Sequence, residues 1–387
     1  MIFKRSDIPG EDIRRAMEMT AKRRQLIDES PADPVVYEYG VNRLANDLHP
    51  GAVRAKITAR KACGADCCRI TLESLAENGR FPYFRAGQFV TLSCRAGDSF
   101  LSRPYSVVSS PEDALGGKLE IMVQRKGVFS KYLIEEAADG SEVTVGEPSG
   151  DFHFDDIRDG SHILAIAGGS GVTPFLSMMK AICEGSEDFR LTLVYGARTR
   201  AHVPFDPADF EDERIRIMIV LSEEEAEGFR HGFITADLLK ECIGDDTSVF
   251  MCGPDAMYRF VRKELESLAF DESRIRQERN SVGDRAVAEK KTFSLTVHIR
   301  DEVFTIEARN DETIVTALER AGIAAPVRCR NGVCGFCHSR LISGDYYIAP
   351  ENDFRRAADL KFGYIHPCST YPESDMEIDI PAVPFDA

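Results

Sequence analysis

Short runs with an alternating apolar pattern dominate the chain from about residue 53 to residue 148. They are rich in β-branched residues and are separated by turn residues, which is typical of an antiparallel β-barrel. One helical run, VFSKYLIEEA, interrupts them. The strand-like runs are VRAKITARKA, CRITLESL, QFVTLSC, YSVVSS, KLEIMVQR and SEVTVGE.

The pattern changes beyond residue 159, where nearly continuous apolar runs alternate with helical patterns. Strands that are apolar on both sides are expected in a parallel sheet that helices cover on both faces. This part of the chain is therefore predicted to be an α/β nucleotide-binding domain. Its strand-like runs are HILAIA, LTLVY, IRIMIVLS and SVFM.

The two ends of the chain and one internal stretch carry different patterns. An amphipathic helix is predicted from Glu11 to about Asp28, with a second short helical segment before His49. Residues 276–291 are polar and lack periodicity, as in a linker. A predicted hairpin (FSLTVHI and VFTIEA) and a helix follow it. The predicted parts are a helical extension (1–50), a flavin-binding β-barrel (51–158), an NAD(P)-binding α/β domain (159–275), a linker (276–291) and a β-grasp ferredoxin domain (292–387).

Composition narrows the classes of partner. The 387 residues carry a formal net charge of -16, which disfavours binding to nucleic acid. Neither a signal peptide nor an apolar stretch of membrane-spanning length is visible, so no membrane span and a cytoplasmic location are expected. In that compartment the eleven cysteines favour metal or redox chemistry over disulfides. The acidic run Glu223-Glu224-Glu225 is interpreted as a solvated loop.

Four cysteines form the most specific motif. Cys329, Cys334 and Cys337 follow a C-x4-C-x2-C spacing, and Cys368 comes about thirty residues later. Thiolates at this uneven spacing are typical of a plant-type [2Fe-2S] cluster, whereas a structural zinc site normally uses paired C-x2-C knuckles. A zinc site or unligated thiols remain the alternatives. The motif predicts a one-electron carrier.

A second set of residues suits a flavin. Arg103, Tyr105 and Ser106 belong to an RPYS sequence that we place at the start of a barrel strand. The arginine can pair with a diphosphate, the tyrosine ring can stack on an isoalloxazine, and the serine can bond a ring nitrogen. Further along, Gly127 and Ser130 open the helical run, whose N-terminus favours an anion.

A third set suits a nicotinamide coenzyme. The turn Gly168-Gly169-Ser170-Gly171 follows a strand, and Thr173 is the expected N-cap of the next helix. Backbone can approach a pyrophosphate closely there. A Cys252-Gly253-Pro254 sequence ends a later strand, at the edge where open α/β sheets bind ligands.

In this order, the RPYS, GVFS, GGSGVTP and CGP motifs resemble the ferredoxin-NADP reductase superfamily, and the cysteine domain resembles a plant-type ferredoxin. The domain order is similar to that of reductase components of multicomponent oxygenases, of the phenylacetyl-CoA epoxidase reductase type, and of hybrid-cluster-protein reductases. The resemblance implies FAD, with FMN as the lesser alternative. It also implies the residue roles: Arg103, Tyr105, Ser106 and Ser130 at the flavin, Gly169, Gly171 and Thr173 at NAD(P)H, and Cys252 beside the nicotinamide.

Two groups of arginines each allow two interpretations, ligand or partner binding and solvation. Arg198 and Arg200 follow the strand LTLVY and can hold a 2′-phosphate, or they can be solvated, so NADH and NADPH both remain open. Three further arginines lie around the cysteine loop. They can guide docking to an acidic partner or be locally solvated. These three are Arg328, Arg330 and Arg340.

The expected function is an NAD(P)H-dependent flavin and iron-sulfur reductase. A hydride carries two electrons and a [2Fe-2S] cluster accepts one, so a flavin must separate them before delivery to a protein acceptor. The identity of that acceptor is not encoded in a readable motif. The alternative is a non-catalytic electron-transfer subunit of a larger redox complex.

Overall fold

The computed structural model describes residues 10–29, 40–41, 44–45, 50–279 and 281–381. It divides into two units, residues 1–46 and 47–387. In the first unit, helix α1 covers Gly10–Asp28, in agreement with the predicted helix. The second predicted segment lies largely outside the described residues. No described helix combines the length and the apolar character needed to cross a bilayer.

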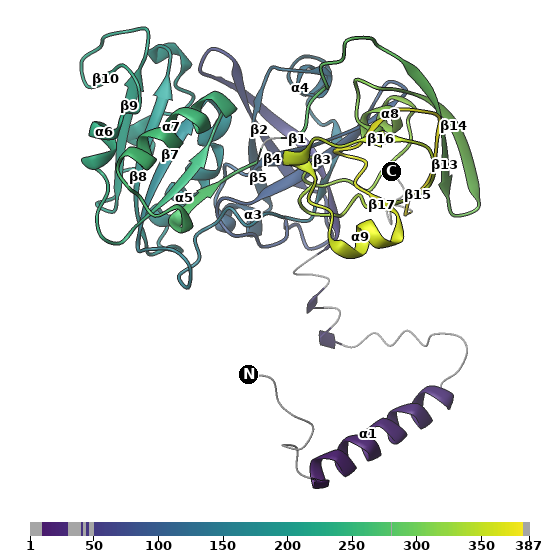
Figure 1. Cartoon of the computed structure of the whole chain (residues 1–387). Helices are drawn as coiled ribbons and strands as arrows, with labels where there is room; N and C mark the ends of the chain where they lie inside the picture. The colour runs from purple at the N-terminus through teal and green to yellow at the C-terminus, as the bar shows by residue number, and fades with distance from the viewer. Residues whose placement is uncertain (1–9, 30–39, 42–43, 46–49, 280, 382–387) are drawn as a thin grey trace. The chain divides into compact units, whose positions relative to one another are not determined.

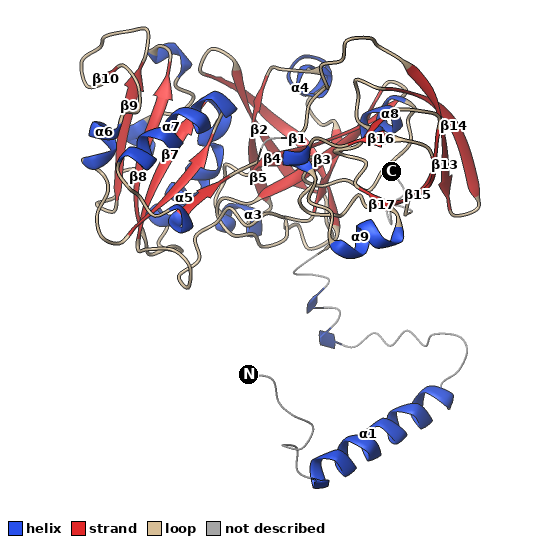
Figure 2. Cartoon of the chain, in the orientation of Figure 1, coloured by secondary structure: helices blue, strands red, loops and turns tan. Residues whose placement is uncertain are grey.

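The first domain of the larger unit is an antiparallel six-stranded sheet in the order β4-β3-β6-β1-β2-β5. Figures 1 and 2 label strands β1 to β5 of this sheet. Its inward side chains, such as Ile57, Ile70 and Val90, are fully buried in one apolar core. The predicted helical run divides into α4 (Val128–Lys131) and a π-helical turn (Tyr132–Glu136). The strands are β1 (Ala52–Cys63), β2 (Cys67–Ser74), β3 (Phe89–Ala96), β4 (Ser99–Ser106), β5 (Lys118–Gln124) and β6 (Glu142–Gly146), and a short helix α3 (Pro111–Leu115) precedes β5.

The RPYS sequence lies at the end of strand β4, so our expectation that it begins a strand was wrong. Residues 99–102, which do not look strand-like, pair with β3 and place the strand earlier. Pro104 lacks an N–H group, and a proline is tolerated inside a strand that has a free edge. Strand β4 is the first strand of the sheet order, which explains how Pro104 fits there.

The second domain is a parallel sheet in the order β10-β9-β8-β7-β11-β12. One apolar core, which includes helix α5, covers one face, and a second core with α6 and α7 covers the other, as the apolar strands predicted. The strands are β7 (His162–Gly168), β8 (Arg190–Ala197), β9 (Ile215–Leu221), β10 (Arg230–His231), β11 (Thr247–Cys252) and β12 (Ile275–Gln277), and the helices are α5 (Thr173–Cys183), α6 (Ala236–Lys240) and α7 (Asp255–Ser267).

The third domain is a five-stranded mixed sheet in the order β14-β13-β19-β15-β17, against which α8 packs. The stretch predicted as a linker begins within β12 and then lies along this domain, where Val282 N donates to Arg330 O and Arg285 N donates to Asp311 O. The elements are β13 (Thr292–Ile299), β14 (Glu302–Arg309), α8 (Ile314–Arg320), β15 (Ser339–Ser343), β16 (Tyr346–Tyr347), α9 (Ala357–Phe362), β17 (Tyr364–Ile365), β18 (Tyr371–Pro372) and β19 (Met376–Asp379).

Candidate flavin, nicotinamide and iron-sulfur site

One cavity of about 640 Å³ brings the three sets of motifs together. It lies where the carboxyl ends of β7 and β11 face the end of β4, the usual ligand position of an open α/β sheet. Cys329 and Asn331 of the cysteine loop also line it. The predicted residues that line this cavity are Tyr105, Ser106, Gly168, Gly169, Gly171, Thr173, Cys252, Gly253 and Pro254.

Strand β4 brings Tyr105 and Ser106 to the barrel side of this cavity. Tyr105 lies beside Phe129, with 6.3 Å between the ring centroids, and burial raises the pKa of its hydroxyl. Its hydroxyl is therefore neutral at physiological pH. Ser106 pairs with Phe89 of β3, which fixes the strand end at the cavity wall. An aromatic face and a hydroxyl at one wall suit a flat, polar-edged ring.

Three other predicted flavin residues do not line the cavity. The Arg103 guanidinium donates through Nη1 to both carboxylate oxygens of Glu319, at 2.8 and 3.0 Å. The Ser130 hydroxyl accepts from the N–H groups of Lys126 and Gly127, at 3.0 and 2.9 Å. That hydroxyl holds its own loop in shape, and Gly127 is the N-cap residue of α4.

The glycine turn after β7 combines an unusual backbone conformation with close packing. Gly169 has a φ of 58°, and a side chain there would meet no atom within 4 Å, so the backbone borders open space. A Cβ on Gly171 would lie 2.1 Å from the carbonyl oxygen of Cys252. Gly171 is thus required for packing of the turn against β11, and the positive φ of Gly169 favours a glycine at that position.

Thr173 does not cap the helix as expected. A 3-10 turn, Gly169–Val172, precedes α5, and Val172 occupies the N-cap position without a side-chain bond. Thr173 is instead the first helical residue, and its hydroxyl donates to the carbonyl of Ser170. Because the 3-10 turn runs directly into α5, the N-cap position falls on Val172, whose side chain cannot accept a hydrogen bond.

Cys252 and a carboxyl group that the sequence did not reveal face the same cavity. Burial raises the pKa of the Cys252 thiol, and the nearby Glu278 raises it further. Glu278 follows β12, and its Oε2 atom is inaccessible to solvent and has no hydrogen-bond partner among the described residues. Burial raises the pKa of Glu278 to about 8. The carboxyl group is therefore mostly protonated at neutral pH.

A second cavity of about 720 Å³ adjoins the first through Gly168, Gly169 and Pro254. Arg198 lines it, and Nη2 of Arg198 lies 2.8 Å from His202 Nε2 and 4.0 Å from an oxygen of Asp66. Asp66 comes from the β1–β2 hairpin of the barrel. The Asp66 carboxylate and the Arg198 guanidinium therefore line this cavity side by side.

Arg200 is bound by a carboxylate that we expected to be solvated. Its backbone N–H and its Nε donate to the Glu224 carboxylate at 2.8 and 2.7 Å, and these bonds lower the pKa of Glu224. The prediction of a solvated acidic loop was wrong for Glu224, which is half-buried and ion-paired. The two segments adjoin because β8 and β9 are neighbouring parallel strands.

The cysteine loop places its four thiols in contact with one another. Cys329 contacts both Cys334 and Cys368, and Cys337 contacts Cys368. Within the described part of the chain no three ligand side chains converge on a single metal position. The four thiols therefore form one chain of contacts, and these side chains would hold the cluster.

The backbone of the loop also suits a cluster. Gly332 and Gly335 have φ angles of 85° and 68°, and a Cβ on Gly332 would lie 2.7 Å from Asn352 O. The Phe336 N–H donates to the Cys334 sulfur at 3.5 Å. Such bonds from backbone to sulfur are among the means by which proteins tune cluster potentials.

Three family models match the chain in the order of these domains. They are an oxidoreductase FAD-binding domain (residues 54–154), an oxidoreductase NAD-binding domain (165–263) and a 2Fe-2S iron-sulfur cluster binding domain (297–373). The chain is 30% identical over 325 residues to one subunit of the 1,2-phenylacetyl-CoA epoxidase of Escherichia coli (strain K12), with 77% of this chain and 89% of that protein covered. The chain belongs to the ferredoxin-NADP reductase family.

A further relative supports the assignment of this reductase, and one solved structure has a similar fold. The chain is 29% identical over 307 residues to the NADH oxidoreductase HCR of Escherichia coli (strain K12), covering 78% of the reductase and 91% of that protein. Its fold is similar to that of phthalate dioxygenase reductase, at 23% identity and a TM-score of 0.61, with 86% and 98% of the two chains covered.

The reductase is an oxidoreductase with FAD, NAD(P)H and a [2Fe-2S] cluster, and the alternative of a non-catalytic subunit is set aside. It passes electrons from the coenzyme through flavin and cluster to an acceptor. When bound, the flavin supplies the conversion of a two-electron hydride into single electrons.

The arginines around the cluster differ from our prediction. Arg330 is only 5% exposed and pairs with Glu319 at 2.8 Å, so it is neither a docking residue nor solvated. Arg328 pairs with Glu147 of the barrel at 2.6 Å and lies over the Phe336 ring. Arg340 remains exposed. Two of the three residues therefore bind other parts of this chain.

Proposed function

We propose that this reductase oxidises NADH and delivers single electrons to a separate oxygenase protein. The observation that carries the proposal is the position of the cluster loop. Cys329 is 6% exposed and lines the cavity shared by the flavin and nicotinamide motifs, whereas Cys334 is exposed at the surface. The loop thus connects the cavity to the surface, as an electron exit requires.

Each wall of the cavity has a role in this proposal. Tyr105 and Ser106 orient the flavin ring, and the turn from Gly168 to Gly171 takes the coenzyme pyrophosphate at the start of α5. Cys252 packs beside the nicotinamide and excludes water. Glu278 holds a proton on its carboxyl group in the same enclosed space, because burial disfavours its charged form.

The second cavity supports NADH as the coenzyme. A 2′-phosphate needs a cation that is available to bind it. Arg200 is already paired with Glu224, and Arg198 has Asp66 beside it. Asp66, which lines the second cavity together with Arg198, would repel a phosphate at the expected adenosine end. The similarity to an NADH oxidoreductase agrees with this preference.

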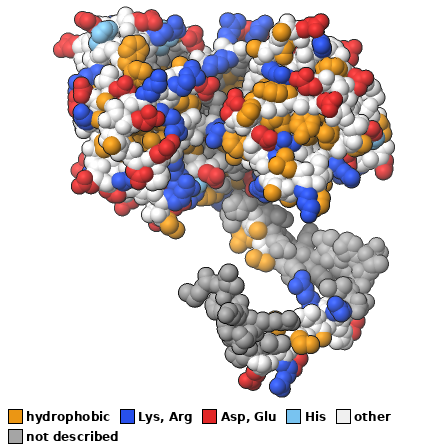
Figure 3. All heavy atoms as spheres, in the orientation of Figure 1, with side chains coloured by type: hydrophobic (Ala, Val, Ile, Leu, Met, Phe, Trp, Pro, Cys, Tyr) orange, Lys and Arg blue, Asp and Glu red, His pale blue; other side chains and the backbone are white. Residues whose placement is uncertain are grey.

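An oxygenase is the acceptor that the similarities favour, because one relative is a subunit of an epoxidase and one similar structure is a dioxygenase reductase. On the face in Figure 3, acidic and basic side chains are interspersed. We also propose a cytoplasmic location, since none of the eleven cysteines is paired in a disulfide and an oxidising compartment would favour their oxidation.

Anaerobic addition of NADH to the purified holoprotein tests the proposal. We expect the flavin absorbance to bleach first and the cluster absorbance afterwards, with a cluster signal that appears in electron paramagnetic resonance. NADPH is the matched control and should act more slowly. If NADH reduces neither centre, the proposed function is wrong, and if both are reduced but no oxygenase accepts the electrons, the choice of acceptor is wrong.

A further inference from the structure

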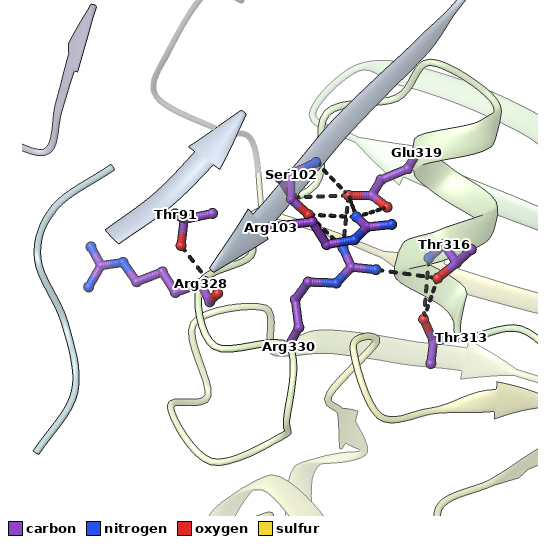
Figure 4. A network of polar contacts seen from close by, with 8 residues as sticks. All are labelled: Thr91, Ser102, Arg103, Thr313, Thr316, Glu319, Arg328 and Arg330. Atoms are coloured by element: carbon purple, nitrogen blue, oxygen red, sulfur yellow. Dashed lines mark hydrogen bonds and ion pairs between the residues drawn. The ribbon is translucent and has the colours of Figure 1, made fainter. Parts of the chain in front are cut away.

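A single buried carboxylate joins the flavin barrel to the ferredoxin domain. Glu319 lies in helix α8 and is 2% exposed. It accepts hydrogen bonds from the backbone N–H and the hydroxyl of Ser102, at 2.9 and 3.0 Å, and from Nη1 of Arg103 and of Arg330. Figure 4 shows these side chains converging from strand β4, from α8 and from the cluster loop. We call these four residues the interdomain clamp.

The members of the clamp come from segments that carry redox centres. Ser102 and Arg103 immediately precede the Tyr105 and Ser106 wall of the cavity, and Arg330 is the residue after Cys329. Arg330 has a φ of 56°, a conformation that costs energy for a residue with a side chain. Its bonds to Glu319, to the Ser102 carbonyl at 3.2 Å and to Thr316 hold it there.

Charge makes Glu319 the central member of the clamp. Two guanidinium groups meet one carboxylate, and Arg330 and Glu319 are almost completely buried. Without the carboxylate, the buried Arg330 would face the partly exposed Arg103, and two like charges would have no counter-charge between them. Removal of one partner from a buried ion pair is far more damaging than loss of an exposed one. The barrel and the cluster loop would then repel each other at this point.

We propose that Glu319 is a positioning residue that docks the cluster loop onto the flavin barrel and so fixes the cluster beside the flavin. This inference rests on the proposed electron path. With both groups bound, the flavin would supply single electrons to the cluster, and the residues of the clamp would hold the two binding segments together. Glu319 takes no electron and contacts neither sulfur nor cavity. It sets the separation over which the electron moves.

The chain offers a matched control for a change at Glu319. Glu312 is also a nearly fully buried carboxylate of the ferredoxin domain, 1% exposed, and it pairs with Arg309 and Arg320. Both of these arginines belong to the ferredoxin domain itself. Glu312→Gln therefore removes a buried charge from the same domain without touching the interface with the barrel.

The test compares Glu319→Gln with Glu312→Gln in the full-length holoprotein. The first substitution keeps the size of the side chain but removes its charge, so hydrogen exchange of residues 99–104 and 328–333 should accelerate together, by roughly 10²-fold if the buried pair has its usual strength. In stopped-flow, NADH should reduce the flavin at the wild-type rate while cluster reduction slows at least tenfold. The cluster spectrum should be unchanged, because the four thiols remain.

Several results would overturn the proposal. Wild-type exchange and a wild-type rate of cluster reduction in Glu319→Gln would show that the clamp does not position the cluster. Equal effects in Glu312→Gln would show a general loss of domain stability. If Glu319→Gln does not fold, Ser102→Ala removes one bond from the barrel side and should slow cluster reduction without altering flavin reduction. Loss of flavin reduction in the wild type would refute the electron path itself.

Discussion

Glu278 makes the stability of this fold depend on pH. Its pKa of about 8 lies above the ordinary value of 4.5 because burial disfavours the carboxylate. The native state therefore binds the proton more tightly than the unfolded state does. Above pH 4.5 the unfolded chain releases that proton and the native state keeps it, so this group reduces stability progressively until pH 8, where the loss levels off.

The size of the effect follows from about 1.4 kcal/mol for each unit of pKa difference. At pH 6 the cost is about 2 kcal/mol, and above pH 8 it reaches about 5 kcal/mol. Glu278→Gln cannot ionise, so the variant should gain about 3 kcal/mol relative to the wild type between pH 6 and pH 9. Any constant effect of the amide cancels in this comparison.

Thermal unfolding of the apoprotein at a series of pH values measures this difference. A change of 1 kcal/mol shifts the Tm of a 150–250-residue domain by roughly 2–4 °C, so the Tm difference between variant and wild type should widen by about 6–12 °C. Glu266→Gln, an exposed carboxylate on α7, is the control and should show no such trend. A Tm difference that is constant from pH 6 to pH 9 would refute the buried, protonated state of Glu278.

Substitutions in the other parts of the site should each have a separate effect. Cys334→Ser should abolish the cluster spectrum and leave NADH-dependent flavin reduction intact; loss of both would contradict separate centres. Arg103→Ala should lower flavin content if Arg103 serves a diphosphate as well as Glu319, and unchanged content measured by absorbance would restrict it to the interdomain clamp. Glu224→Gln should release Arg200 and improve kcat/KM for NADPH about two- to fivefold, as expected for loss of an exposed ion pair; an unchanged ratio of NADH to NADPH efficiency would exclude Glu224 as a selectivity residue.

The sequence predicted best where a motif is complete within a few residues. The Cys329 to Cys337 spacing, the glycine turn after β7 and the period of the apolar runs all reflect local geometry, and the fold class and cofactors follow from them. Strand β4 was misplaced because its first residues have no apolar alternation and because Pro104 looks like a strand start. The position of β4 is set by its pairing with β3, and this pairing cannot be predicted from the local sequence.

The partners of individual charged side chains could not be predicted from local motifs. Arg330 and Arg103 resemble solvated or ligand-binding arginines in sequence, but each has Glu319 as its partner, and that residue lies more than two hundred positions from Arg103. Glu278 has no motif, and its raised pKa arises only from the enclosure formed around it. Such contacts depend on which segments the fold brings together.

For this reductase the sequence by itself determined the chemistry that each domain carries: a flavin wall, a coenzyme turn and four cluster thiols. Only the tertiary structure decided how these are joined, with Cys329 at the shared cavity, Cys334 at the surface and Glu319 between the barrel and the cluster loop. The physical reason is the range of the interactions. Ligand spacing and backbone conformation are fixed by neighbours along the chain, whereas burial and ion pairing are fixed by residues that meet only after folding.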